Sequence, residues 1–82
     1  MSKTLAVHDL CRVAKQPKNQ FAKLVDTVGF IVTIEGDYCD FQAITLDGLG
    51  SGFGTLPLDC LELETRSEWL RAFQSYKGYN EF

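Results

Sequence analysis

The middle of the sequence has no basic residues: no lysine or arginine lies between Lys23 and Arg66. Neutralisation of phosphates by lysine and arginine dominates the affinity of proteins for nucleic acids. The same region carries eight carboxylates, Asp26, Glu35, Asp37, Asp40, Asp47, Asp59, Glu62 and Glu64. We therefore expect no direct binding to nucleic acid. The acidic segment either keeps a small domain soluble or docks on a partner protein with a basic surface.

Long apolar runs are also missing. No segment approaches the roughly 18 apolar residues of a membrane span, and residues 1–10 lack the apolar centre of a signal peptide. The 82 residues are 45% hydrophobic and 23% charged, which is an ordinary globular composition. The sequence predicts a single cytoplasmic domain over residues 1–82, with no membrane contact.

Histidine and cysteine are too few and too scattered for the common catalytic and metal sites. His8 is the only histidine, and the three cysteines, Cys11, Cys39 and Cys60, form no C-x-x-C pair. We expect them to be buried thiols. No two-ligand helical spacing suggests a metal site. We expect no metal, no cofactor, no small-molecule substrate and no enzymatic activity, unless His8 folds beside Cys39 or Cys60.

Alternating apolar residues predict an antiparallel hairpin that turns at Gly36-Asp37. The first run places Val28, Phe30, Val32 and Ile34 on one face and Ile31 and Thr33 on the other; the second places Phe41, Ala43 and Thr45 opposite Gln42, Ile44 and Leu46.

Two shorter strands are expected outside the hairpin. Residues 9–15 form one candidate, because Cys11 and Val13 alternate with Arg12, although a helix over residues 4–15 is an alternative. A polar loop containing Pro17 follows. Leu61 and Leu63 alternate with glutamates and indicate the last strand.

Four glycines stand at alternate positions, 48, 50, 52 and 54. In the dinucleotide-binding motif G-x-G-x-x-G the third glycine would fall on Phe53 or Thr55, so the spacing fails. The pattern instead predicts a hairpin tip, with Gly50 and Gly52 in the loop, or a strand crossing close over a barrel.

Residues 65–78 predict one amphipathic helix. Thr65 and Glu68 have the spacing of a capping box, and Gly78 can end the helix. The apolar positions of the helix are Trp69, Leu70, Phe73 and Tyr76. We expect this stripe to cover an edge or an open end of the sheet. Alternatively, its aromatic residues anchor another chain.

Five short strands with these connections describe a small, partly open barrel. The order "CRVAK … LVDTVGFIVTIEGDYCDFQAITLDG … GTLPLDCLELE" resembles bacterial and plastid SH3-like barrels. These include the SH3-like protein of photosystem I, the ferredoxin-thioredoxin reductase variable chain, KOW domains and the acidic antirepressor CarS. The matching positions are Gly29, Val32, Ile34, Gly36, Pro57, Leu61 and Glu62. The resemblance implies a mainly β fold, a five-stranded SH3-like barrel over about residues 8–64 with the amphipathic α-helix at 65–78.

The function predicted from these features is a non-catalytic protein-protein interaction module, an accessory or regulatory factor that docks on a basic partner surface, as an antirepressor does. The expected contact residues are Glu35, Asp37, Asp40, Asp47, Trp69 and Tyr76. One alternative is an accessory component, structural or of an electron-transfer complex, held by apolar contacts of the helix. Another is a KOW-like nucleic-acid-binding domain.

Overall fold

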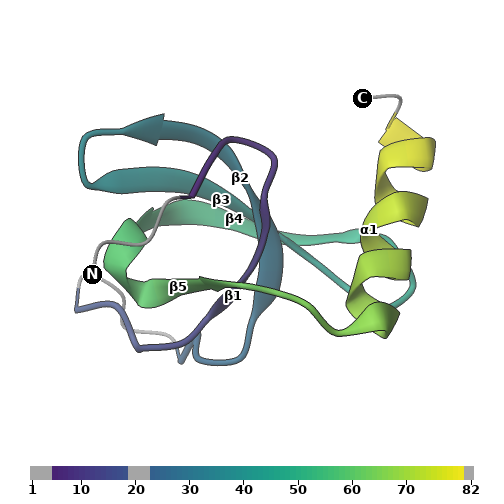
Figure 1. Ribbon diagram of the computed structural model, residues 1–82, viewed down its shortest axis with the longest axis horizontal. Coiled ribbons are helices and arrows are strands. Elements are labelled where there is room, and N and C mark those ends of the chain that lie inside the picture. Colours follow the sequence, from purple (N-terminus) through teal and green to yellow (C-terminus); the bar gives the residue numbers. More distant parts are fainter. Residues whose placement is uncertain (1–4, 19–22, 81–82) are drawn as a thin grey trace.

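The computed structural model describes residues 5–18 and 23–80, which form an antiparallel sheet followed by a helix (Figure 1). The elements are β1 (Leu10–Val13), β2 (Val28–Glu35), β3 (Tyr38–Ile44), β4 (Gly50–Pro57), a 3-10 helix η1 (Leu58–Cys60), β5 (Leu61–Leu63) and α1 (Ser67–Asn80). The five strands are ordered β4-β3-β2-β1-β5. The prediction of a mainly β fold with a C-terminal helix is confirmed.

The predicted hairpin of β2 and β3 lies at the centre of the sheet, and Gly36 in its turn has a φ of 63°. β1 is a strand rather than a helix, and it pairs with β2 on one side and β5 on the other. β4 and β5 are the two edges, and the sheet does not close into a ladder between them. A closed barrel is therefore not confirmed.

All five strands nevertheless enclose one apolar core. We call this the inner core; it consists of Cys11, Val13, Ile31, Cys39, Phe41, Ala43, Leu56 and Leu61. Figure 1 shows β1 and β5 lying in front of β3 and β4, so the sheet bends around these side chains. Burial of their apolar surface is the main force that holds the strands together.

A bulge in β2 changes the predicted faces of that strand. The pairing with β3 shifts between Ile31 and Thr33. Because an extra residue reverses the alternation of side chains, Ile34 packs on the inner core together with Ile31. The prediction that Ile34 shares a face with Phe30 and Val32 is therefore wrong. Those two residues belong to the outer face of the sheet.

The predicted loop tip at Gly50 and Gly52 is also wrong, because both glycines belong to β4. Gln42 pairs with Phe53, whereas Ile44 pairs with Gly50, so β4 carries one more residue than β3 over this interval. The amide of Gln42 donates to the carbonyl of Gly52 at 3.1 Å and fixes the irregular part of the strand.

The turn between β3 and β4 requires glycine at position 48. Gly48 has a φ of 82°, and a Cβ there would lie 2.6 Å from Cβ of Ser75 in α1. We expect Gly48→Ala to lower the free energy of unfolding by about 1–3 kcal/mol, measured by urea denaturation. Gly52→Ala is the matched control, because an added Cβ at Gly52 meets nothing within 4 Å. Equal effects of the two substitutions would contradict the close contact between the turn and α1.

The helix packs on the outer face of the sheet, as Figure 1 shows at the right of the view. Ala72 and Phe73 are buried, and the Phe73 ring stacks on Phe30 with 5.2 Å between centroids. The outer core comprises Leu10, Val28, Phe30, Ile44, Ala72 and Phe73, with Val32, Trp69 and Tyr76 partly buried against it. Leu70, expected in the apolar stripe, is instead 44% exposed.

Both predicted ends of the helix are displaced. The helix continues through Gly78 to Asn80. The helix begins at Ser67 rather than at residue 65. The backbone N–H of Thr65, which the predicted capping box would bond to the Glu68 side chain, instead donates to Oε2 of Glu64 at 3.0 Å.

Candidate interaction surfaces

Acidic side chains gather where β2 turns into β3. We call this region the hairpin end and define it by Glu35, Asp37 and Asp40. Glu35 and Asp37 are exposed. Asp40 lies within β3, and its carboxylate accepts hydrogen bonds from the hydroxyls of Thr33 at 2.9 Å and Thr55 at 3.0 Å. The two neighbouring strands therefore fix this carboxylate in place.

The hairpin end keeps its negative charge. Within the described ranges 5–18 and 23–80, its three carboxylates form no ion pair with lysine or arginine. Asp59 lies nearby, because it follows Leu58, whose N–H donates to the carbonyl of Asp37 at 2.9 Å. Within the described residues, the carboxylates of Glu35, Asp37 and Asp40 are therefore not paired with a basic side chain.

A hollow of about 310 Å³ opens beside Asp40, and it is lined by Thr33, Glu35, Tyr38, Cys39, Asp40 and Thr55. Burial raises the pKa of the Cys39 thiol to about 11, and the charge of Asp40 adds to this effect. The thiol is thus protonated at neutral pH and is a poor nucleophile. The carboxylates determine the chemistry of the hollow.

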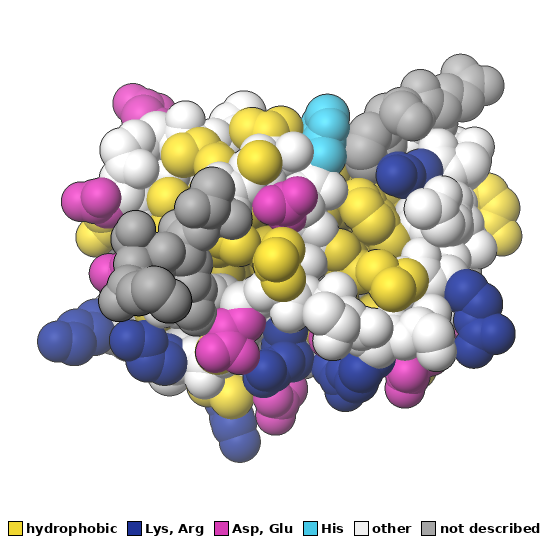
Figure 2. All heavy atoms as spheres, viewed as in Figure 1, with side chains coloured by type: hydrophobic (Ala, Val, Ile, Leu, Met, Phe, Trp, Pro, Cys, Tyr) yellow, Lys and Arg dark blue, Asp and Glu magenta, His cyan; other side chains and the backbone are white. Residues whose placement is uncertain are grey.

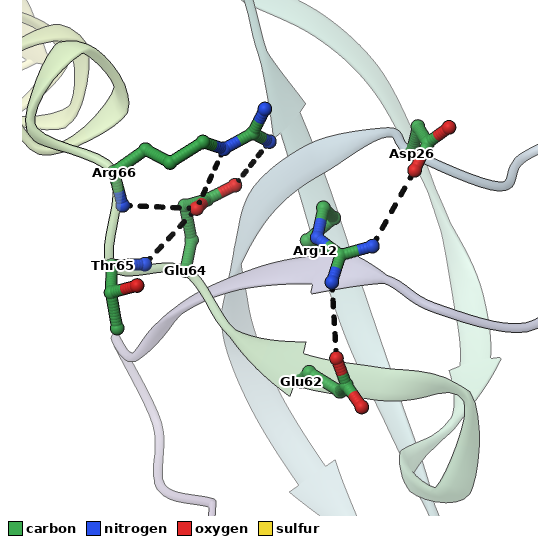
Figure 3. Close-up of polar contacts among 6 residues, drawn as sticks. All are labelled: Arg12, Asp26, Glu62, Glu64, Thr65 and Arg66. Atoms are coloured by element: carbon green, nitrogen blue, oxygen red, sulfur yellow. Dashed lines mark hydrogen bonds and ion pairs between the residues drawn. The ribbon is translucent and has the colours of Figure 1, made fainter.

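Other carboxylates of the acidic segment form ion pairs with an arginine that is distant in the sequence. Arg12 on β1 lies 3.4 Å from Asp26 and 3.0 Å from Glu62 on β5 (Figure 3). The acidic segment is therefore not one continuous acidic surface.

Glu64 is nearly buried just after β5, and Figure 3 shows four contacts converging on its carboxylate. The Arg66 guanidinium donates to both oxygens, at 2.6 and 3.0 Å, and the backbone N–H groups of Thr65 and Arg66 donate to Oε2. The hydrogen bonds from the Arg66 side chain lower the pKa of Glu64 to about 2, although burial opposes the shift.

The structure separates the predicted contact residues into three places. Glu35, Asp37 and Asp40 lie together at the hairpin end. Asp47 is exposed in the turn after the far end of β3, roughly 20 Å away at the rise of an extended strand. Trp69 and Tyr76 lie on α1 and are partly buried against the protein's own sheet.

A second hollow, which was not predicted, lies between α1 and the outer face of the sheet. This α1 groove has a volume of about 560 Å³ and is lined by His8, Phe30, Val32, Gln42, Phe53, Tyr76 and Lys77. Figure 2 shows apolar side chains gathered there, with the single histidine at the rim. The sequence held one signal for it, an aromatic residue, Phe53, between two glycines.

The described residues contain no group of three or more His, Cys, Asp or Glu side chains that could hold a metal ion. His8 is exposed at the α1 groove, whereas Cys39 is buried in the inner core. No helix in the described part of the chain is both long and apolar enough to cross a bilayer.

No protein-family model, curated protein or solved structure matches the chain.

Proposed function

We propose that this protein is a non-catalytic interaction module that docks its hairpin end on a basic surface of a partner protein. The observation that carries the proposal is the cluster of uncompensated carboxylates of Glu35, Asp37 and Asp40 at one end of the sheet. Elsewhere the fold neutralises Asp26, Glu62 and Glu64 with arginine. The remaining negative charge at the hairpin end would steer a basic partner toward it.

The geometry of Asp40 supports the same proposal. Its carboxylate is held by two hydroxyls on adjacent strands, so little side-chain freedom would be lost when a cationic group binds. The neighbouring hollow is open and bears the exposed ring of Tyr38. An arginine or lysine of the partner would find a fixed acceptor there.

We further propose that the sheet is an SH3-like barrel left open between its two edge strands, and that the protein is a cytoplasmic regulator of the antirepressor kind. Five antiparallel strands around one core support the first part, and the acidic end supports the second. The alternative of an accessory component held by α1 is weaker, because Trp69 and Tyr76 pack against the protein's own sheet.

Charge reversal at the hairpin end tests the proposal. We expect the double variant Glu35→Lys and Asp37→Lys to fold normally, since both side chains are exposed, and to lose a partner captured by the wild type from its host lysate at low salt. With the purified partner, the association rate constant should fall about tenfold or more. Asp40 is left unchanged because it joins three strands.

The matched control is Asp47→Lys with Glu68→Lys, which changes the net charge equally at exposed positions near α1. It should retain the partner, and high salt should release the partner from the wild type. Equal retention by the wild type and the hairpin-end variant would refute docking through this end.

A further inference from the structure

The helix covers only part of the outer face of the sheet. Phe73 and Ala72 pack over one half, where Phe30 stacks with Phe73. Beyond α1 the apolar face continues through Val32 to Phe53, whose side chain is 64% exposed. An exposed aromatic residue beside an apolar hollow is typical of a binding surface.

Local contacts fix the shape of the α1 groove. The Gln42 side chain in its floor donates to the carbonyls of Ala43 at 3.0 Å and Gly52 at 3.1 Å. A Cβ at Gly50 would lie 3.3 Å from Nε2 of Gln42, so the absence of a side chain at Gly50 leaves room for the Gln42 amide in the floor. The Tyr76 ring lies 5.2 Å from that of Phe30. At about 560 Å³ the groove falls in the size range of ligand sites.

Among the described residues, the ionisable side chains that line the groove are those of Lys77, His8 and Tyr76, and none of the described lining residues carries a carboxylate. The Lys77 ammonium lies over the Phe73 ring, 4.8 Å from its centroid, which holds the charge beside the apolar floor. His8 has a φ of 75°, uncommon outside glycine, and its backbone N–H donates to the carbonyl of Ile31 at 2.7 Å.

The described rim carries a basic side chain, Lys77, although the chain as a whole has a net charge of −3. We infer that the α1 groove binds a protein segment that presents an aromatic or large aliphatic side chain next to a carboxylate. The apolar side chain would pack between Phe53 and Tyr76, and the carboxylate would pair with the Lys77 ammonium at the rim. This second site lies on the outer face of the sheet. It prefers a negatively charged group, whereas the hairpin end prefers a positively charged one.

The lining favours a protein segment over a nucleic acid. Val32 and Phe30 give the floor an aliphatic and aromatic surface. One lysine supplies little neutralisation for a polyanion. A single carboxylate attached to an apolar group matches one ammonium beside an apolar hollow.

The test uses two small probes that differ chiefly in charge, 4-phenylbutyrate and 4-phenylbutylamine, titrated into ¹⁵N-labelled full-length protein. We expect the carboxylate probe to shift the amide resonances of Val32, Gln42, Phe53, Tyr76 and Lys77. Its affinity should exceed that of the amine at least about threefold. The inference is overturned if the amine binds equally or better, if neither probe binds, or if the shifts lie outside the groove.

Two variants locate the interaction. Phe53→Ser should remove binding of the carboxylate probe without unfolding the protein, because that side chain is mostly exposed. Lys77→Gln should bring the affinities of the two probes to within about twofold of each other. Unchanged discrimination in Lys77→Gln would refute the assigned role of the ammonium. If a ten-nucleotide oligothymidylate shifts the same resonances more strongly, the ligand of the groove is single-stranded nucleic acid and the inference of a protein segment is overturned.

Discussion

Replacing Phe73 with alanine is expected to lower the free energy of unfolding by about 3–5 kcal/mol, as for buried aromatic residues generally. Phe73 is 6% exposed and stacks on Phe30, which belongs to the central strand β2. The truncation leaves a cavity between helix and sheet and removes the ring under the Lys77 ammonium. Domains of this size have a total stability of only about 5–15 kcal/mol, so the variant should be largely unfolded near physiological temperature. Thermal unfolding followed by circular dichroism measures the effect.

Leu70→Ala is the control on the same helix. Leu70 is 44% exposed, so its truncation should cost less than about 1 kcal/mol. A Phe73→Ala protein as stable as Leu70→Ala would show that α1 does not contribute to the core. Loss of partner binding without loss of stability would indicate instead that the helix is an interface.

The second large effect concerns Glu64. We expect Glu64→Gln to lower the free energy of unfolding at pH 7 by about 1–3 kcal/mol, because charged hydrogen bonds to a buried acceptor are lost. The pKa of Glu64 is lowered to about 2 in the folded protein, below the ordinary glutamate value of 4.5. Its contribution is therefore fully present above about pH 4.5 and is lost as the pH falls toward 2. Urea unfolding of both proteins at several pH values measures this difference.

The difference between wild type and Glu64→Gln should shrink steadily between these two pH values. Glu62→Gln is the matched control: its side chain is 46% exposed and its carboxylate pairs with Arg12. The control should change stability by no more than about 1 kcal/mol. A Glu64 effect that does not vary with pH in this range would refute the lowered pKa.

Elements that depend on local pattern could be predicted from the sequence. The β2–β3 hairpin follows from strict alternation and a turn containing glycine, and α1 follows from helical spacing. The register could not be predicted in the same way. The bulge after Ile31 and the extra residue near Gly52 depend on what lies opposite in β3, which no single segment encodes.

Prediction of the candidate sites was limited for the same reason. Glu35 ends β2 and Asp37 lies in the turn that follows, so their proximity follows from the hairpin. Arg12 meets Glu62 across 50 positions, so the neutralisation of part of the acidic segment depends on the pairing of β1 with β5. The α1 groove likewise combines residues from five separate segments, namely the stretch before β1, the strands β2, β3 and β4, and the helix α1. Its position follows from the docking of α1 on the outer face.

The burial of β2 on both faces limits how the sequence can vary. The four consecutive positions from Val28 to Ile31 are all buried, and Phe30 and Ile31 belong to different cores. Gly29 has no space for a side chain, since a Cβ would lie 2.1 Å from the carbonyl oxygen of Gln42. Most strands of a small sheet have one face toward solvent, where a substituted side chain can be accommodated. Between Val28 and Ile31 every position is buried, so relatives of this chain should diverge least there and most along the exposed side of α1.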